Sequence, residues 1–322
     1  MNFKRHRAAL IVVAALIPSA AGAETWPART VSVVAASAPG GTHDVFARLL
    51  APGLSTALGQ AVIVDNRAGA GSNIGYQSVA QAKPDGYTLL IGALPLATAP
   101  FIYKTLSYDS QRDLQPIRLI ARIPNLVVVN AKSDVRSVKE LVDLLKRNPG
   151  KYNYASPGAG TSVHLGTELF KDMTGTDILG VHYKSSAQSI SAVLANEVLV
   201  AFENIPVALP HVRAGTLRAL AVTSATRSAN LPDVPSMAEA GIAGYDVSSW
   251  FGLLAPTGTP PEVIRRLDEA TLTYVKSPSM QEKLRAMGAK PASEGSDAFR
   301  QFIRAESEKW GKVIRKAGIK AE

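Results

Sequence analysis

The sequence predicts an α/β protein built on mainly parallel sheets and divided into two lobes. Short apolar runs alternate with segments of helical periodicity, a pattern typical of parallel strands covered by helices on both faces. The runs amount to roughly ten strands, more than one compact sheet of this length normally holds. Weak joins between the lobes are expected at 122–125 and 243–247.

The expected strands share Val-, Ile- or Leu-rich composition and end at Gly, Pro, Asn or Ser. They cover 31–37, 61–65, 88–92, 117–123, 126–130, 152–155, 178–181, 198–202, 217–223 and 250–255. The expected helices between and after them cover 137–147, 162–173, 187–194, 207–214 and a long amphipathic C-terminal segment.

Start and stop residues support two of the helices. Ser137 is expected to cap the helix 137–147, with Glu140 at the third helical position as in a capping box. Another helix begins at Thr42. Pro52, followed by Gly53, interrupts that helix and is expected to kink or end it.

Residues 1–23 have the features of a secretory signal. A basic start precedes an apolar run that is too short to span a membrane, and Ala21-Gly22-Ala23 fits a cleavage site. Cleavage after Ala23 is therefore expected, with export of the mature chain to the periplasm.

Composition narrows the possible functions. The chain carries 35 basic and 26 acidic residues, and removal of the signal lowers the net charge from +9 to +6, because three basic residues are lost. No block of Lys or Arg alternates with aromatics, so no nucleic-acid partner is expected. The chain has no Cys, which excludes disulfides and zinc–thiolate sites. The histidines after the signal lack metal-ligand spacing, and neither a metal nor another cofactor is expected.

The stretch VSVVAASAPGGTHDVFARLL, from Val31 to Leu50, points to a ligand site. An apolar strand ends at Gly40 and Gly41, and a helix begins at Thr42. Free N–H groups and the dipole at a helix start favour an anion, and glycines allow close approach. A simple strand-to-helix turn explains the same pattern.

Three more Gly-rich or turn segments follow expected strands, at 68–72, 156–164 and 202–206. The spacing of Gly69, Gly71 and Gly75 differs from the dinucleotide fingerprint, so a nucleotide site is weakly supported. Strand ends of this kind are where open α/β sheets bind ligands. Together the loops would offer backbone N–H groups and the small hydroxyls of Ser37, Thr42, Ser72, Ser156 and Thr161.

Two alternatives concern single residues. Ser156 and His164 would suit a hydrolase, but no obvious carboxylate orients the histidine, and catalysis is not expected. Asp44 is explained by the preference for carboxylates in the first turn of a helix, or by contacts with loop N–H groups or a ligand.

Five segments in order resemble the Bug-type substrate-binding proteins of tripartite tricarboxylate transporters. They are VSVVAASAPGGTHDVFARLLA, VIVDNRAGAGSNIGYQSVAQAKPDGYTLL, YNYASPGAGTSVHLGTELF, LPHVRAGTLRALAVTSATRSANLPDVPSMAEAG and WFGLLAPTGTPPEVIRRL. The resemblance implies a two-lobed periplasmic binding protein, type II-like, with two crossovers. Residues 24–123 and 247–322 would form one lobe and 124–246 the other.

The resemblance also implies a function without catalysis. Backbone groups of the first loops, partly through ordered water, would hold a small organic carboxylate, and the second lobe would close over it. A monomer would then deliver this ligand to membrane transporter subunits. Presentation of the ligand to a signalling sensor is the alternative.

Site residues follow from the segments that match. The first lobe is expected to contribute Ser37, Ala38, Pro39, Gly40, Gly41, Asp44, Gly69, Ala70, Gly71, Ser72 and Leu94, and the second lobe Ser156, Gly158, Gly160, Thr161, His164, Glu203 and Asn204. In this interpretation, Gly40 and Gly41 expose backbone donors to the carboxylate.

Several positions depart from the family pattern. Ser37 stands where an aromatic is common, Leu94 and Leu96 replace polar residues, and Glu203 replaces Asp. Ser185 and Ser186 replace glycines. These changes predict a roomy, partly apolar far end of the cleft and a ligand with an apolar or aromatic body.

Overall fold

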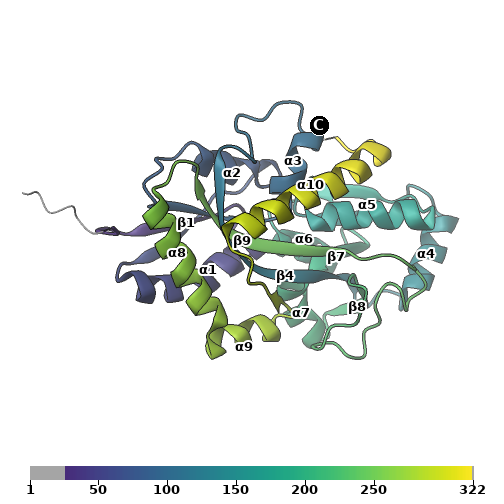
Figure 1. Ribbon diagram of the computed structural model, residues 1–322. Coiled ribbons are helices and arrows are strands. Elements are labelled where there is room, and N and C mark those ends of the chain that lie inside the picture. The colour runs from purple at the N-terminus through teal and green to yellow at the C-terminus, as the bar shows by residue number, and fades with distance from the viewer. Residues whose placement is uncertain (1–25, 321–322) are drawn as a thin grey trace, which may run out of the picture.

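The computed structural model describes residues 26–320 as two sheets that share one long strand, β4 (Leu114–Asn130) (Figure 1). The expected signal, 1–23, lies outside the described residues. Among the helices of the described part, none combines the length and apolar character needed to cross a bilayer.

The first sheet has the strand order β2-β1-β3-β9-β4, with β10 also paired to β4. Its other strands are β1 (Val31–Ala35), β2 (Val62–Asn66), β3 (Thr88–Gly92), β9 (Ser248–Pro256) and β10 (Lys290–Pro291). The helices around it are α1 (Thr42–Leu58), η1 (Ala70–Ser72), α2 (Asn73–Ala80), α3 (Pro95–Ile102), α8 (Pro261–Lys276), α9 (Pro278–Ala286) and α10 (Ser296–Ala317).

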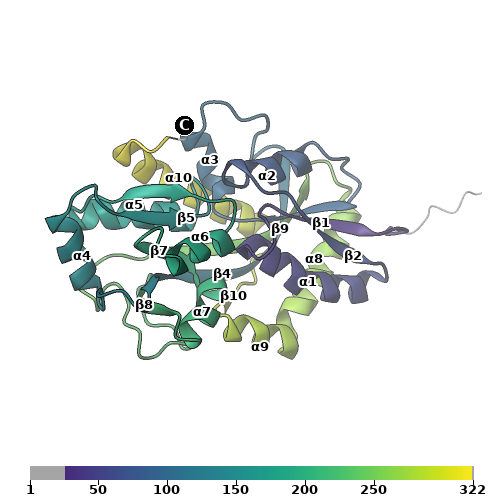
Figure 2. The ribbon, with the colours of Figure 1, turned by 180° about the vertical axis from the view of Figure 1, so that it is seen from behind.

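The second sheet has the order β4-β7-β5-β6, with β8 also paired to β4. Its strands besides β4 are β5 (Asn153–Ser156), β6 (Leu179–His182), β7 (Val200–Asn204) and β8 (Leu217–Val222). Its helices are α4 (Val138–Arg147), α5 (Ser162–Thr174), α6 (Ser186–Leu194) and α7 (Ile205–Arg213). Seen from behind, α5, α6 and α7 surround this sheet (Figure 2).

The two-lobed α/β architecture is confirmed, but each sheet is mixed rather than mainly parallel. The pairs β1–β2, β1–β3, β5–β6 and β5–β7 are parallel, whereas every pair that includes β4 or β9 is antiparallel. β4 and β9 lie where the chain crosses between lobes, which accounts for their opposite direction.

β4 replaces the two strands expected at 117–123 and 126–130. Pro124 and Asn125 suggested a break, yet both belong to the ladder: Pro124 pairs with Ser248 of the first sheet and Asn125 with Asn204 of the second. The change of sheet therefore occurs within one continuous strand.

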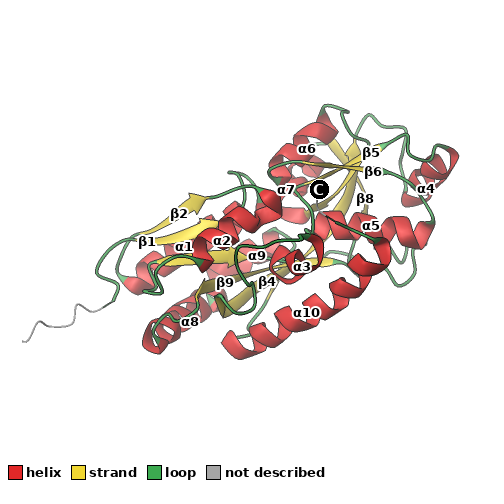
Figure 3. Cartoon of the chain, turned by 90° about the horizontal axis from the view of Figure 1, so that it is seen from above, coloured by secondary structure: helices red, strands yellow, loops and turns green. Residues whose placement is uncertain are grey.

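Both faces of the central strands are buried, as the continuous apolar composition of β1 requires. Val33 belongs to a core that α1, α6, α7, α8 and α9 cover, and its neighbour Val34 to a core beneath α2, α3, α4, α5 and α10. Seen from above, α10 runs along the first lobe and reaches α5 of the second (Figure 3).

Of the two outcomes expected at Pro52, a kink or an end of the helix, the end is contradicted, because helix α1 continues through this residue. It continues to Leu58 and ends at Gly59, whose φ is 71°. Leu50, Leu54 and Leu58 are buried along one side, so packing holds the turn in which Pro52 removes a hydrogen bond.

The Ser137 cap is confirmed. The Ser137 hydroxyl accepts a hydrogen bond from the Glu140 N–H at 3.1 Å. The Glu140 carboxylate instead accepts from the N–H of Arg136, one residue before the cap position.

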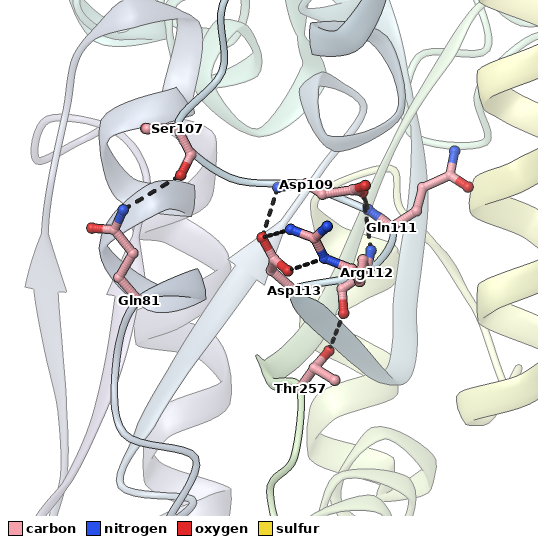
Figure 4. A network of polar contacts seen from close by, with 7 residues as sticks. All are labelled: Gln81, Ser107, Asp109, Gln111, Arg112, Asp113 and Thr257. Atoms are coloured by element: carbon pink, nitrogen blue, oxygen red, sulfur yellow. Dashed lines mark hydrogen bonds and ion pairs between the residues drawn. The ribbon is translucent and has the colours of Figure 1, made fainter.

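The segment between α3 and β4 is held by its own polar contacts (Figure 4). Asp113 accepts hydrogen bonds from the Asp109 N–H at 2.8 Å and from Arg112 Nε at 2.7 Å. Thr257, after β9, donates to the Arg112 carbonyl at 2.6 Å. These contacts fasten the loop that begins at Tyr103 to the first sheet.

Candidate ligand-binding site

A cavity of about 580 Å³ lies between the two sheets and is lined by residues from both. The first lobe contributes the loops after β1 and β2, the start of α3, Tyr103 and part of β9. The second lobe contributes the loops after β5 and β6 and the end of β7. This volume is within the range of pockets that hold small organic ligands.

Several helices begin at the cavity. Lining residues at or beside these helix starts are Thr42 of α1, Ser72 before α2, Thr161 and Ser162 of α5, Ser185 and Ser186 of α6, and Asn204 before α7. The N–H groups of a first helical turn have no partner within the helix, and the dipole makes this end positive. The cavity therefore has the electrostatic character of an anion site.

The expected site residues divide into two groups. Those that line the cavity are Ser37, Gly69, Ala70, Gly71, Ser72, Gly158, Thr161 and Asn204. Those outside the lining are Ala38, Pro39, Gly40, Gly41, Asp44, Leu94, Ser156, Gly160, His164 and Glu203. Most of the second group hold the loops that carry the first.

The donors of Gly40 and Gly41 serve the loop itself, contrary to the expectation that they face a carboxylate. The Gly40 N–H donates to Asp44 Oδ2 at 3.0 Å, and the Gly41 N–H to the Ala38 carbonyl at 3.1 Å. The two following residues, Thr42 and His43, line the cavity. The first turn of α1, rather than the glycines before it, therefore lies at the cavity.

Asp44 organises this loop. Its carboxylate accepts from Gly40, from Asn66 Nδ2 at 3.0 Å and from Arg48 Nε at 2.9 Å. Burial alone raises the pKa of Asp44, but the hydrogen bonds from Arg48, Gly40 and Asn66 outweigh it and hold the pKa below its usual value. Asp44 is therefore ionised at neutral pH, and its carboxylate is engaged by the loop, by α1 and by β2.

The loop after β5 is organised in the same way. The Gly158 N–H donates to Ser156 Oγ at 3.2 Å, and Thr161 Oγ1 donates to the Gly158 carbonyl at 2.8 Å. His164 Nδ1 accepts from the Gly160 N–H at 3.1 Å. Burial, with the nearby His182 and Lys171, lowers the pKa of His164 to about 3, so its ring is neutral. Ser156 and His164 thus hold a loop.

Leu94 and Leu96 do not make the cleft apolar. Both side chains are fully buried in the core beneath α3, and the cavity is lined instead by Ala93 and Pro95. These leucines belong to the segment that forms α3 and its start, where the apolar side chains pack inward. Aromatic surface comes from Tyr103, Tyr183 and Phe251, which the sequence analysis did not identify.

The loop between β6 and α6 was also missed. His182, Tyr183, Lys184, Ser185 and Ser186 all line the cavity. Ser185 caps α6 by accepting from the Gln188 N–H at 3.3 Å. A serine after an apolar strand and before a helix was the available signal, but the two serines were noted only as departures from glycine.

The lobes touch each other around the cavity. Thr42 Oγ1 lies 3.5 Å from Ser186 Oγ, and Thr98 Oγ1 donates to the Gly160 carbonyl at 2.9 Å. Gly71 and Gly158 bring two backbones together: a Cβ on Gly158 would lie 2.8 Å from the Gly71 Cα. The structure is therefore a closed arrangement of the two lobes.

Glu203 lies fully buried beside the cavity. Its Oε1 accepts from the Asn204 N–H at 2.8 Å and from Asn204 Nδ2 at 3.3 Å. Burial raises the pKa of Glu203 above its usual value, and hydrogen bonds from Ser186 and Asn204 only partly oppose this.

Glu203→Gln is expected to stabilise the protein increasingly as pH rises. A raised pKa in the folded state means that folding takes up a proton above the ordinary carboxyl pKa, so wild-type stability falls as pH rises through this window. Gln keeps the acceptor toward Asn204 and does not titrate. Urea unfolding at pH 5 and pH 7 checks this, and an equal difference between the proteins at both pH values would contradict it.

Two sheets are joined by crossover segments, and several helices begin at the cavity between them. This arrangement defines a two-lobed solute-binding protein. Among the described residues, no group of His, Asp and Glu is arranged to hold a metal ion. Residues 46–319 match the model of the tripartite tricarboxylate transporter family receptor, TctC. The chain belongs to this family of periplasmic solute-binding proteins.

Relatives and solved structures agree with this assignment. Protein BugT of Bordetella pertussis is 37% identical over 324 residues, covering 99% of each chain. The structure of R. palustris Rpa4515 with adipate is 38% identical, with a TM-score of 0.89, and covers 92% of this chain and all of that one. MatC of Rhodopseudomonas palustris with bound malate is 28% identical, with a TM-score of 0.85 and coverage of 90% and 100%.

Proposed function

We propose that this protein captures a small organic carboxylate between its lobes and delivers it, unchanged, to the membrane subunits of a tripartite transporter. The observation that carries the proposal is the convergence of helix starts from both lobes on one cavity. Among the described residues that line this cavity, none is Asp or Glu, so no carboxylate of the lining repels an anion. The adipate and malate in the neighbouring structures support a carboxylate.

We further propose that the lobes comprise 24–123 with 247–322, and 124–246. Pairing with β9 of the first sheet ends at Pro124, and pairing with β7 of the second begins at Asn125. Thr223 supports a hinge here: its Oγ1 accepts from the Asn125 N–H and donates to the Val247 carbonyl, both at 2.7 Å. One buried hydroxyl thus joins both segments that cross between the lobes.

The expected ligand contacts combine the two lobes. We propose that Ser37, Thr42 and Ser72 bind the carboxylate from the first lobe, and Thr161, Ser186 and Asn204 approach it from the second. Non-catalytic binding fits the second-lobe loop, where Ser156 and His164 are each engaged with loop atoms rather than poised toward the cavity.

A thermal-shift panel tests the proposal. Aliphatic and aromatic mono- and dicarboxylates should include acids that raise the melting temperature, because a ligand at one hundred times its Kd adds about 2.7 kcal/mol of stability. Their amides and methyl esters should give no shift, and sugars none. Bound acid recovered by mass spectrometry should be chemically unchanged. Shifts confined to sugars, or esters that act as well as acids, would overturn the assignment.

A further inference from the structure

We propose that ligand capture is coupled to the uptake of a proton from solvent by the Glu203 carboxyl group, so that the protein binds its ligand more tightly as pH falls. This inference rests on the proposed function and concerns the regulation of the same site. Glu203 does not line the cavity, but the two residues that hydrogen-bond to its carboxyl group, Ser186 and Asn204, both do. A single layer of side chains therefore separates the cavity from a buried acid.

Glu203 is a fully buried carboxyl group without a counter-ion. It lies near the end of β7, between β4 and β5, and α5, α6 and α7 pack against this strand (Figure 2). Helix α6 carries no titratable side chain, and β5 carries only Tyr154, which donates to Glu168. Within residues 26–320, no ion pair includes Glu203.

The charged groups on the other elements that pack against β7 are engaged elsewhere or lie at a distance. His164 of α5 is neutral and accepts from the Gly160 N–H. His211 and Arg213 lie in the last turn of α7, at the opposite end from Glu203. Every other charged side chain of α5 and β4 is already in an ion pair: Lys171–Glu168, Lys316–Asp172, Arg118–Asp268 and Arg122–Glu294. None of these elements supplies a cation to Glu203.

The hydrogen bonds around Glu203 also favour its protonated form. Oε1 accepts two bonds from Asn204, whereas Oε2 has no partner among the described residues. Asn204 Oδ1 and Asn125 Oδ1 are likewise buried without a donor there, and these two residues pair across β4 and β7. Buried acceptors without donors are costly. A proton on Oε2 adds a donor to this group of acceptors.

A bound anion makes a charge on Glu203 still less favourable. It repels a carboxylate across Ser186 and Asn204, where little water screens the interaction. Closure, in which Thr42 Oγ1 lies 3.5 Å from Ser186 Oγ, also removes water from the residues that cover Glu203. Burial already raises the pKa of Glu203, and the anion raises this pKa further, so binding takes up a proton between the two values. Affinity is highest below this window, falls by up to about tenfold per pH unit through it, and is lowest above it.

Calorimetry in paired buffers provides the test. The probe is whichever of adipate, malate, hexanoate and benzoate gives the largest thermal shift, and it is titrated from about pH 6 to pH 8.5, where its own carboxyl groups are ionised. MES and bis-Tris at the lower pH values, and HEPES and Tris at the higher ones, differ in heat of ionisation, so the difference in binding enthalpy counts the protons taken up. The wild type should take up as much as one proton, with a Kd that rises by up to about tenfold per pH unit over the same range. Glu203→Gln should take up none, with a Kd independent of pH, and Glu203→Met, a second side chain that does not titrate, should behave in the same way.

Two further variants separate Glu203 from other acids and bases. Glu197→Gln is the matched control, because it removes an exposed carboxyl group just before β7 that does not line the cavity. His182 lines the cavity, and histidine is the side chain that most often titrates near neutral pH. The other lining histidine, His43, is buried with its pKa lowered to about 4, so it stays neutral over this range. Glu197→Gln and His182→Gln should both retain the proton uptake.

A wild type that takes up no proton at any pH would overturn the inference but not the proposed function. Uptake that persists in Glu203→Gln, or that is lost in His182→Gln instead, would do the same. Failure of every acid in the thermal-shift panel to bind would overturn the proposed function and, with it, the inference.

Discussion

Gly158→Ala is expected to lower ligand affinity on the order of one hundredfold while leaving both lobes folded. The Cβ of the alanine would lie 2.8 Å from the Cα of Gly71, which belongs to the opposite lobe. No flexible side chain is available to yield, because the atoms that this Cβ would meet belong to the backbone of Gly71. Overpacking of this kind costs about 1–3 kcal/mol, and it arises only when the lobes close.

The matched control is Gly241→Ala. Gly241 also has a positive φ, 99°, but a Cβ there meets nothing within 4 Å. Both variants therefore carry backbone strain, and only Gly158→Ala obstructs closure. Titration of the acid that the thermal-shift panel identifies gives the affinities, and small-angle scattering should show compaction with ligand in the control alone. Wild-type affinity in Gly158→Ala would show that closure does not bring these backbones together.

Local patterns predicted much of the fold. The strand expected at 88–92 matches β3 in full, and the helix expected at 137–147 begins one residue before α4. These segments have clear periodicity and clear boundary residues, so their conformation is determined within a short window. The continuity of β4 through Pro124 was not predictable in this way, because it depends on pairing with β9, more than one hundred residues later.

The site was predictable to the level of loops but not of atoms. The strand-to-helix loops do meet at one cavity, yet Gly40 and Gly41 use their donors internally while Thr42, the next residue, lines it. Such a one-residue offset depends on how Asp44 folds the loop. Lys320 also lines the cavity, and the sequence alone could not place it there. Its position depends on the turn at Gly318 and on the packing of Ile319, which no local pattern relates to the cavity.

Arg118 is expected to be among the residues whose loss most destabilises the protein. It lies in β4 and is largely buried, and its guanidinium contacts both Asp268 carboxylate oxygens at 2.7 and 2.8 Å. It also donates to the Ser293 carbonyl at 2.6 Å. These contacts join the strand that passes between the lobes to α8 and to the segment that leads into α10.

Arg118→Met should lower the free energy of unfolding by roughly 3 kcal/mol, because it leaves Asp268 and the Ser293 carbonyl without their buried partner. Arg122→Met is the control: Arg122 lies on the same strand and pairs with Glu294 at 2.6 Å, but both side chains are about one-third exposed, so its loss should cost no more than about 1 kcal/mol. Adding Asp268→Leu to Arg118→Met should recover part of the loss, since no carboxylate is then left unpaired. Urea unfolding measures all three variants, and equal losses for Arg118→Met and Arg122→Met would refute the role given to burial.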